Sequence, residues 1–124
     1  MIDAKANTTP VQLLVPATRT STANGTGVDI RDYTGRIEVT LDVGAVSGTT
    51  PTLDIKIQES DTSGGTYTDI AGAAFTQVTA SNVIASIGVD IDAVKRYIRA
   101  VATIAGTSPS FACGVNARGI PQIG

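Results

Sequence analysis

Residues 36–43 read Arg-Ile-Glu-Val-Thr-Leu-Asp-Val, and this stretch decides the fold class. Apolar and polar side chains alternate without interruption, so in an extended chain the apolar ones all lie on one face. Such alternation over eight residues indicates a half-buried β-strand. Residues 52–59, Thr-Leu-Asp-Ile-Lys-Ile-Gln-Glu, repeat the pattern after a connector that contains Gly48 and Pro51. The sequence therefore predicts two alternating strands with a short connector at 44–51.

The remaining apolar segments are also short and are separated by turn signals. The chain has 13 glycines and is rich in threonine and valine, a composition that favours strands and tight turns. Asn24-Gly25 predicts a two-residue turn, and residues 90–96 could hold a single helical turn. Residues 95–104 carry apolar side chains on both faces, which predicts a central strand. The other expected strands are residues 11–15, 28–30, 67–70, 75–78, 83–91 and 110–116.

This spacing predicts an all-β fold, a single-domain antiparallel β-sandwich or jelly roll of roughly eight or nine short strands. We expect a flexible N-terminal arm at residues 1–10, the sandwich domain at 11–117 and an extended C-terminal tail at 118–124. The 124 residues fit one domain. The sequence contains neither an apolar run long enough to span a membrane nor, at its start, the apolar core of a secretory signal, so we expect no membrane partner.

A short internal similarity links Gly48-Thr49-Thr50-Pro51-Thr52-Leu53 with Gly106-Thr107-Ser108-Pro109-Ser110-Phe111. Both segments follow an alternating strand and precede another. They are too short to indicate a repeat architecture. We expect two hairpins of the same design within one domain.

The residue types exclude several classes of catalytic site. The sequence has no histidine, which rules out histidine-dependent nucleophilic catalysis and histidine-ligated metal sites. Its one cysteine, Cys113, cannot form a thiolate cluster and is expected to be a small buried apolar residue. Glu38, Asp42 and Asp54 fall on the polar faces of their strands and are expected to be solvated. We therefore expect no enzyme activity and no cofactor.

Two ligand-binding alternatives stay open. Residues 59–64 and 90–92 offer oxygen atoms on turns that could bind calcium, although such residues in turns usually bond their own backbone. Tyr33 and Tyr67 could form a stacking platform for sugars or single strands. The net charge is −2 and the basic residues are scattered, so no direct nucleic-acid contact is expected.

Three segments resemble small structural proteins encoded by tailed bacteriophages: residues 47–61, residues 65–77, and residues 97–103 together with 106–111. The resemblance covers more than half of the chain. It implies a β-sandwich virion component of the capsid decoration or cement type, made in the host cytoplasm and bound to the outer surface of the capsid. The implied partners are the major capsid protein and further copies of this chain, as a homodimer or homotrimer. The resemblance carries no functional residue with it.

The two ends of the chain are the expected capsid contacts, because extended arms can add main-chain hydrogen bonds to a partner. The candidate contact residues are Met1, Ile2, Lys5, Thr9, Pro10, Arg118, Ile120, Pro121 and Ile123. Two other functions are compatible with the same residues. One is a structural component of the tail or neck of the particle. The other is a carbohydrate- or host-surface-binding module, against which the scarcity of aromatic residues counts.

Overall fold

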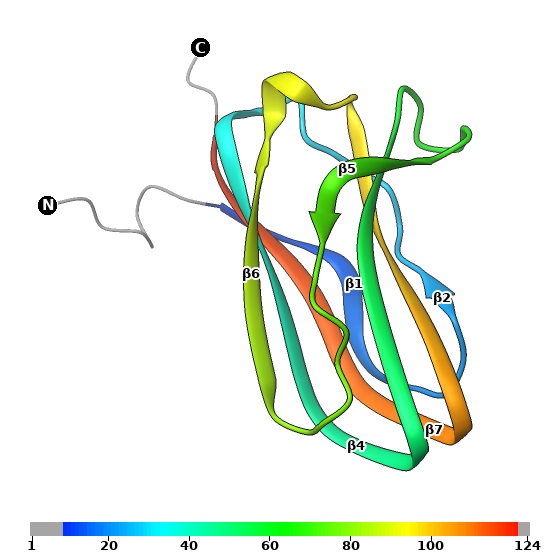
Figure 1. The fold of residues 1–124 in the computed structure, drawn as a ribbon. Coiled ribbons are helices and arrows are strands. Elements are labelled where there is room, and N and C mark those ends of the chain that lie inside the picture. Colours follow the sequence, from blue (N-terminus) through cyan, green and yellow to red (C-terminus); the bar gives the residue numbers. More distant parts are fainter. Residues whose placement is uncertain (1–8, 122–124) are drawn as a thin grey trace, which may run out of the picture.

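A computed structural model describes residues 9–121, and strands make up most of this range (Figure 1). The all-β prediction is confirmed. The elements in chain order are β1 (Thr9–Arg19), β2 (Ala23–Asn24), β3 (Val28–Asp29), β4 (Tyr33–Ser60), β5 (Thr68–Ala74), β6 (Val83–Asp90), the 3₁₀ turn η1 (Ile91–Ala93) and β7 (Tyr97–Pro121).

Two very long strands organise the sheet. β4 has 28 residues and β7 has 25, and they pair antiparallel from Tyr33↔Pro121 to Ser60↔Tyr97. Each runs down the molecule, bends and returns, so the sheet is folded over on itself (Figure 1). β6 and β5 pair with the two halves of β4, and β1, β2 and β3 pair with β7. The expected central strand at 95–104 is thus confirmed as the first half of β7.

The described strands number seven and belong to one continuous antiparallel sheet. Two separate sheets, as in a sandwich or jelly roll, are not confirmed, and neither are eight or nine short strands. The expectation differed because glycine and proline near residues 48 and 106 suggested ends of strands. Hydrogen bonding instead continues through both positions, with local shifts of register.

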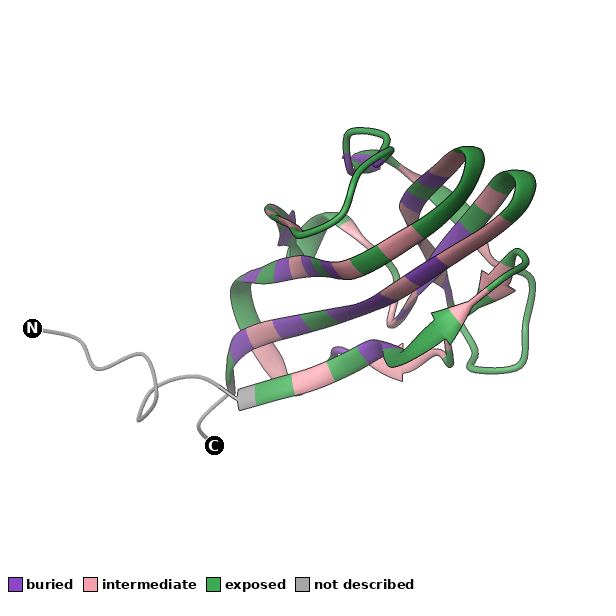
Figure 2. Ribbon diagram, turned by 90° about the horizontal axis from the view of Figure 1, so that it is seen from below, coloured by how far each residue is buried: buried purple, intermediate pink, exposed green. Residues whose placement is uncertain are grey.

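One hydrophobic core lies between the two halves of the folded sheet. The alternation along the long strands is visible in Figure 2 as a change between buried and exposed residues. As predicted, the apolar faces of 36–43 and 52–59 point inward. The buried rows are Ile37, Val39, Leu41 and Val43; Leu53, Ile55 and Ile57; Ile98, Ala100 and Ala102; and Phe111, Cys113, Val115 and Ala117.

At the bend, β4 and β7 adopt the same unusual backbone conformation. Gly48 has φ 113° and is followed by Thr50 at 46°; Gly106 has φ 120° and is followed by Ser108 at 48°. A Cβ on Gly48 would lie 2.7 Å from the Ser108 carbonyl oxygen, and one on Gly106 would lie 2.8 Å from that of Thr50. The prediction that the two similar segments form separate hairpins is therefore wrong. They are the paired strands of a single corner, in which Thr49 lies opposite Thr107.

The similarity between the two parts of the chain extends beyond the corner. Gly-Val-Asp-Ile occurs at residues 27–30 and again at 88–91. In the first copy Asp29 pairs with Tyr97 at the start of β7, and in the second Asp90 pairs with Arg36 near the start of β4. The two parts of the chain thus repeat one strand arrangement, with β3–β7 matching β6–β4.

The expected limits of the domain are corrected at both ends. Thr9 and Pro10 pair with Gly119 and Arg118, and Ile120 pairs with Thr34. Residues 9–10 and 118–121 therefore belong to the sheet rather than to an arm and a tail. Their sequence lacks alternation, but proline is tolerated on an edge strand because an outward-facing position needs no N–H donor.

Two local predictions have different outcomes. Asn24-Gly25 is not a turn, since Gly25 N donates to Ala100 O at 2.7 Å and the segment continues along β7. Glycine is needed there because a Cβ would overlap the Leu13 carbonyl oxygen. The single helical turn is confirmed as η1, and Asp90 caps it by accepting a hydrogen bond from Asp92 N.

Candidate interaction surfaces

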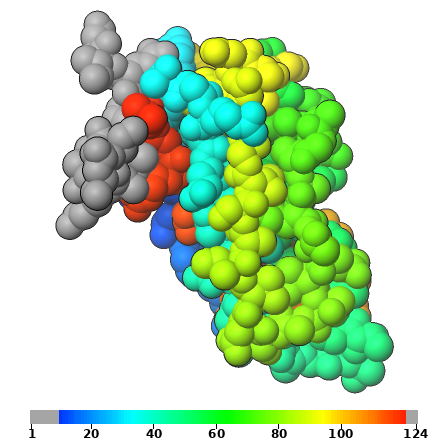
Figure 3. All heavy atoms as spheres, turned by 60° about the vertical axis from the view of Figure 1, so that its left-hand side comes forward, coloured from blue at the N-terminus to red at the C-terminus, as the bar shows by residue number. Residues whose placement is uncertain are grey.

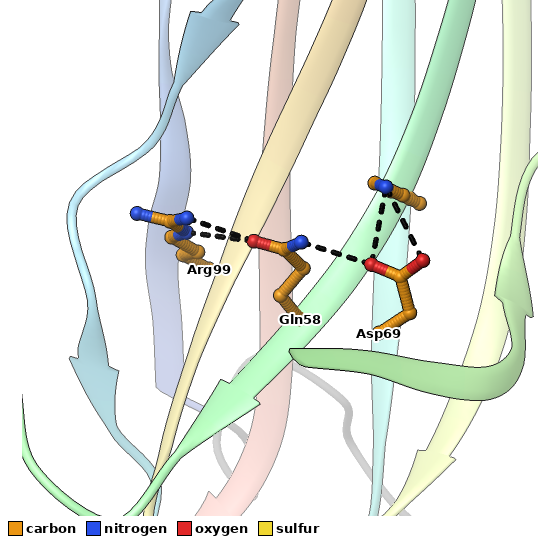
Figure 4. Close-up of polar contacts among 4 residues, drawn as sticks. Gln58, Asp69 and Arg99 are labelled. Carbon is orange, nitrogen blue, oxygen red and sulfur yellow. Dashed lines mark hydrogen bonds and ion pairs between the residues drawn. The ribbon is translucent and has the colours of Figure 1, made fainter. Parts of the chain in front are cut away.

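A connected polar network ties β7, β4 and β5 together on the outward face of the sheet (Figure 4). Arg99 donates to Gln58 Oε1 from Nε at 3.0 Å and Nη2 at 2.8 Å, and Gln58 Nε2 donates to Asp69 Oδ1 at 2.9 Å. Lys56 Nζ lies 3.1 Å from Asp69 Oδ1. The hydrogen bond from Gln58, followed by that from Lys56, lowers the pKa of the Asp69 carboxyl. These polar groups bond one another, and the network acts as a brace across three strands.

Tyr33 and Tyr67 do not form a common stacking platform. The Arg99 guanidinium lies 4.3 Å from the centroid of the Tyr67 ring, and the Tyr67 hydroxyl donates to Ser63 O at 2.9 Å. Tyr33 instead lies against Gly119 at the other half of the sheet. Each tyrosine ring therefore packs against neighbours in its own half of the sheet.

A second ion pair anchors β3 to the segment before β7. Arg96 donates to Asp29 Oδ2 from Nε at 3.0 Å and Nη2 at 2.8 Å, and Arg31 N donates to Asp29 Oδ1 at 2.9 Å. The hydrogen bond from Arg96 is the largest cause of a lowered pKa at the Asp29 carboxyl, and burial opposes it.

The Asp29 pair predicts a pH-dependent contribution to stability. A carboxyl whose pKa is lowered by folding stabilises the fold above its ordinary pKa of 3.8, and the contribution disappears as pH falls through the lower folded value. Asp29→Asn should therefore be less stable than the wild type at pH 7, by a small amount because the pair is partly exposed. Urea unfolding at several pH values should show this difference shrinking below pH 4. An Asp42→Asn control on the exposed face of β4 should not reproduce the trend, and a difference independent of pH would contradict it.

The turn oxygens considered for calcium are used within the protein. Glu59 Oε1 accepts a hydrogen bond from Lys95 N at 3.0 Å, and Asp90 Oδ1 accepts one from Asp92 N at 3.0 Å. No group of three acidic, cysteine or histidine side chains that could hold a metal ion occurs within residues 9–121. The three carboxylates expected to be solvated, Glu38, Asp42 and Asp54, are all exposed.

Cys113 is buried, as expected, with 4% of its surface exposed. Burial raises the pKa of its thiol, so the reactive thiolate is disfavoured at neutral pH. The side chain belongs to the core cluster and acts as a small apolar residue.

The surface of residues 9–121 carries two sizeable open grooves. One, of about 420 Å³, crosses the outward faces of β1, β4 and β7, where Pro16, Gly44 and Gly114 form part of its lining. The other, of about 520 Å³, lies between β5 and the C-terminal half of β6 and is bordered by Arg36, Glu59 and Asp90. Neither of these grooves has an aromatic side chain in its lining.

The candidate contact residues divide into two groups. Met1, Ile2, Lys5 and Ile123 lie outside the described residues. The sheet brings Thr9, Pro10, Arg118, Ile120 and Pro121 together at the end remote from the corner, because the start of β1 pairs with the end of β7. Ile120 is 48% exposed there.

The expected contacts did not include β6, which forms an edge of the described sheet. Ile84 is 72% exposed, the largest value among the exposed large apolar residues of the described chain. The exposure of Ile84 could have been predicted from the sequence. Every second residue of this strand faces the core, namely Val83, Ala85, Ile87 and Val89, and this alternation places Ile84 on the solvent face.

No protein-family model matches this sequence, and a search of curated proteins finds no significant similarity. In the described part of the chain, no helix is both long and apolar enough to cross a membrane.

Proposed function

We propose that this protein is a non-enzymatic structural component of a virion, a capsid cement or decoration protein that binds the outer surface of the major capsid shell and stabilises it. The observation that carries the proposal is the meeting of both described chain ends at one end of the sheet. Thr9 lies opposite Gly119, and Tyr33 lies opposite Pro121. Thr9 and Pro121, the first and last described residues, therefore lie at the same end of the sheet.

The resemblance of residues 47–61, 65–77, and 97–103 with 106–111 to phage structural proteins supports the same function. Binding would use main-chain hydrogen bonds from the terminal segments together with apolar contacts from Pro10 and Ile120. Because such a protein binds the assembled shell and not its separated subunits, binding shifts the equilibrium toward the assembled form. Self-association of the cement protein would add further links between neighbouring capsid subunits.

Co-sedimentation with shells assembled without the protein tests this function. Saturable binding supports it. Binding to isolated tails or necks, with none to shells, would favour a tail or neck component. Binding to glycans alone would favour the host-surface module.

Deleting residues 2–8 should weaken binding to shells by on the order of tenfold, the equivalent of about 1.4 kcal/mol of lost contacts. Ile120→Lys should weaken it similarly, because it places a charge at the proposed contact end. Thr107→Lys, an exposed position at the corner, is the matched control and should bind like the wild type. Circular dichroism should show that all three variants are folded. Undiminished binding by the truncated protein and by Ile120→Lys would remove this end of the sheet from the mechanism.

A further inference from the structure

The edges of the sheet differ in how well they are protected against pairing with another strand. Natural proteins protect exposed strand edges with prolines, bulges, charges or short strands. β1 carries Pro10 and Pro16 and has two shifts of register against β7. β2 and β3 have two residues each and are separated by the segment around Gly25. β5 contains Gly72 at φ 78° and is irregular in its pairing.

From Val83 to Val89, β6 has none of these protections. It makes eight consecutive pairs with β4, from Val43↔Val83 to Arg36↔Asp90, without a shift of register. Residues 83–89 contain neither a proline nor a charged side chain. Among the described residues β6 pairs with β4 alone, so its other edge offers unpaired backbone donors and acceptors. Figure 3 shows β6 at the surface along this side of the molecule.

The comparison between the two similar parts of the chain strengthens this contrast. β3 is the counterpart of the end of β6, since both carry the Val-Asp of the repeated Gly-Val-Asp-Ile. On the β3 side the chain bulges at Gly25, which packs against the Leu13 carbonyl, and the edge is interrupted. At the corresponding place β6 is not interrupted, and it continues as a regular strand with an open edge.

We propose that β6 is the contact through which two copies of this chain pair, antiparallel and about a twofold axis at Ser86. This inference builds on the self-association within the proposed function and names its surface. A twofold contact requires one strand to be complementary to itself. Pairing Ser86 with Ser86 of the second copy satisfies that requirement residue by residue.

In this register the exposed Ile84 faces Gly88 of the second copy, over which the Arg36 side chain of that copy lies. The Arg36 side chain that lies over Gly88 offers its flat guanidinium to the isoleucine. On the inner face, the half-buried Ala85 and Ile87 face one another across the axis. Asp90 falls beside Asn82 of the second copy rather than beside a like charge. A register moved by two residues would place Ile84 opposite Asp90, which is a poorer match.

The groove between β5 and β6 leaves space for this approach. It has a volume of about 520 Å³ and runs beside residues 88–90, so β5 does not seal the edge of β6 there. In the proposed dimer, the β1–β7–β4–β6 half of one sheet would continue into the same half of the second copy. Both Ile84 side chains would then be removed from water.

A charge exchange at Ser86 tests the axis directly. Sedimentation velocity at increasing protein concentration should show a reversible dimer for the wild type. Ser86→Lys and Ser86→Asp each place like charges opposite one another and should each weaken dimerisation by at least about tenfold. An equimolar mixture of the two variants should restore a dimer, because the charges across the axis are then opposite.

Asn116→Lys is the matched control, since it adds the same charge to an exposed position of β7, away from the edge of the sheet. It should dimerise like the wild type. A monomeric wild type, dimers that persist in both Ser86 variants, or a mixture that fails to associate would each overturn the inference. The experiment contains no shells. A dimer that fails to bind shells would therefore contradict the proposed function alone, and a monomer that binds them would contradict this inference alone.

Discussion

Phe111→Ala is expected to lower the free energy of unfolding by about 3–5 kcal/mol. Phe111 is fully buried and is the largest of the wholly buried side chains. It follows the corner directly, where β7 enters its second half, and pairs with Val46 on one side and Arg19 on the other. The rest of the core consists mostly of valine, isoleucine, leucine and alanine, and small rigid side chains refill such a cavity poorly.

The measurement is urea unfolding followed by circular dichroism. Small domains are typically stable by only 5–15 kcal/mol, so the variant should lose a large part of its stability. Phe111→Leu is the control: it keeps most of the apolar volume and should cost much less. If Phe111→Ala lowers the free energy of unfolding by less than about 1 kcal/mol, the prediction is contradicted, because the core would then not be tightly packed around this ring.

Gly106→Ala is expected to cost on the order of 3 kcal/mol, because two separate penalties act at one residue. The backbone φ of 120° is rarely adopted by a residue with a side chain. A Cβ there would also lie 2.8 Å from the Thr50 carbonyl oxygen and 2.9 Å from the Pro51 Cα, both of which are backbone atoms of the paired strand. Gly48→Ala should lower the stability by a similar amount, because Gly48 and Gly106 occupy equivalent positions on the two paired strands of the corner.

Gly64→Ala provides the matched control, because a Cβ at Gly64 meets nothing within 4 Å. It should leave stability nearly unchanged. Protection of the buried Cys113 thiol against a thiol reagent gives a second measure of opening, and the Gly106 variant should react faster than the Gly64 variant. Equal stability of these two variants would contradict the account of the corner.

Local alternation was sufficient to predict which residues of β4 face the core. Residues 36–43 and 52–59 each show a period of two, and this pattern depends only on neighbouring residues. The central position of residues 95–104 was also predictable, because apolar side chains occupy both faces of that segment.

The continuity of β4 and β7 through the corner could not be predicted in this way. Glycine and proline near residues 48 and 106 have the local signature of a turn, whereas the hydrogen bonds that carry the strands onward come from residues more than fifty positions away. The same reason explains Gly25, whose conformation is set by contact with Leu13 and Ala100 rather than by its preceding asparagine.

The proposed contact surfaces were only partly accessible to sequence reasoning. The ends of the chain were expected to bind, but that residues 9–10 and 118–121 meet at one place follows from the pairing of β1 with β7. The open edge of β6 depends on which strands are neighbours, and no local pattern contains that information.

Electron microscopy of shells saturated with the protein tests the central claim most directly. The account predicts ordered density on the outer surface of the shell that fits the folded sheet, with the end that holds Thr9 and Pro121 facing the capsid and the corner facing solvent. Ordered density confined to the tail or neck, or a shell surface left bare at saturating protein, would contradict it.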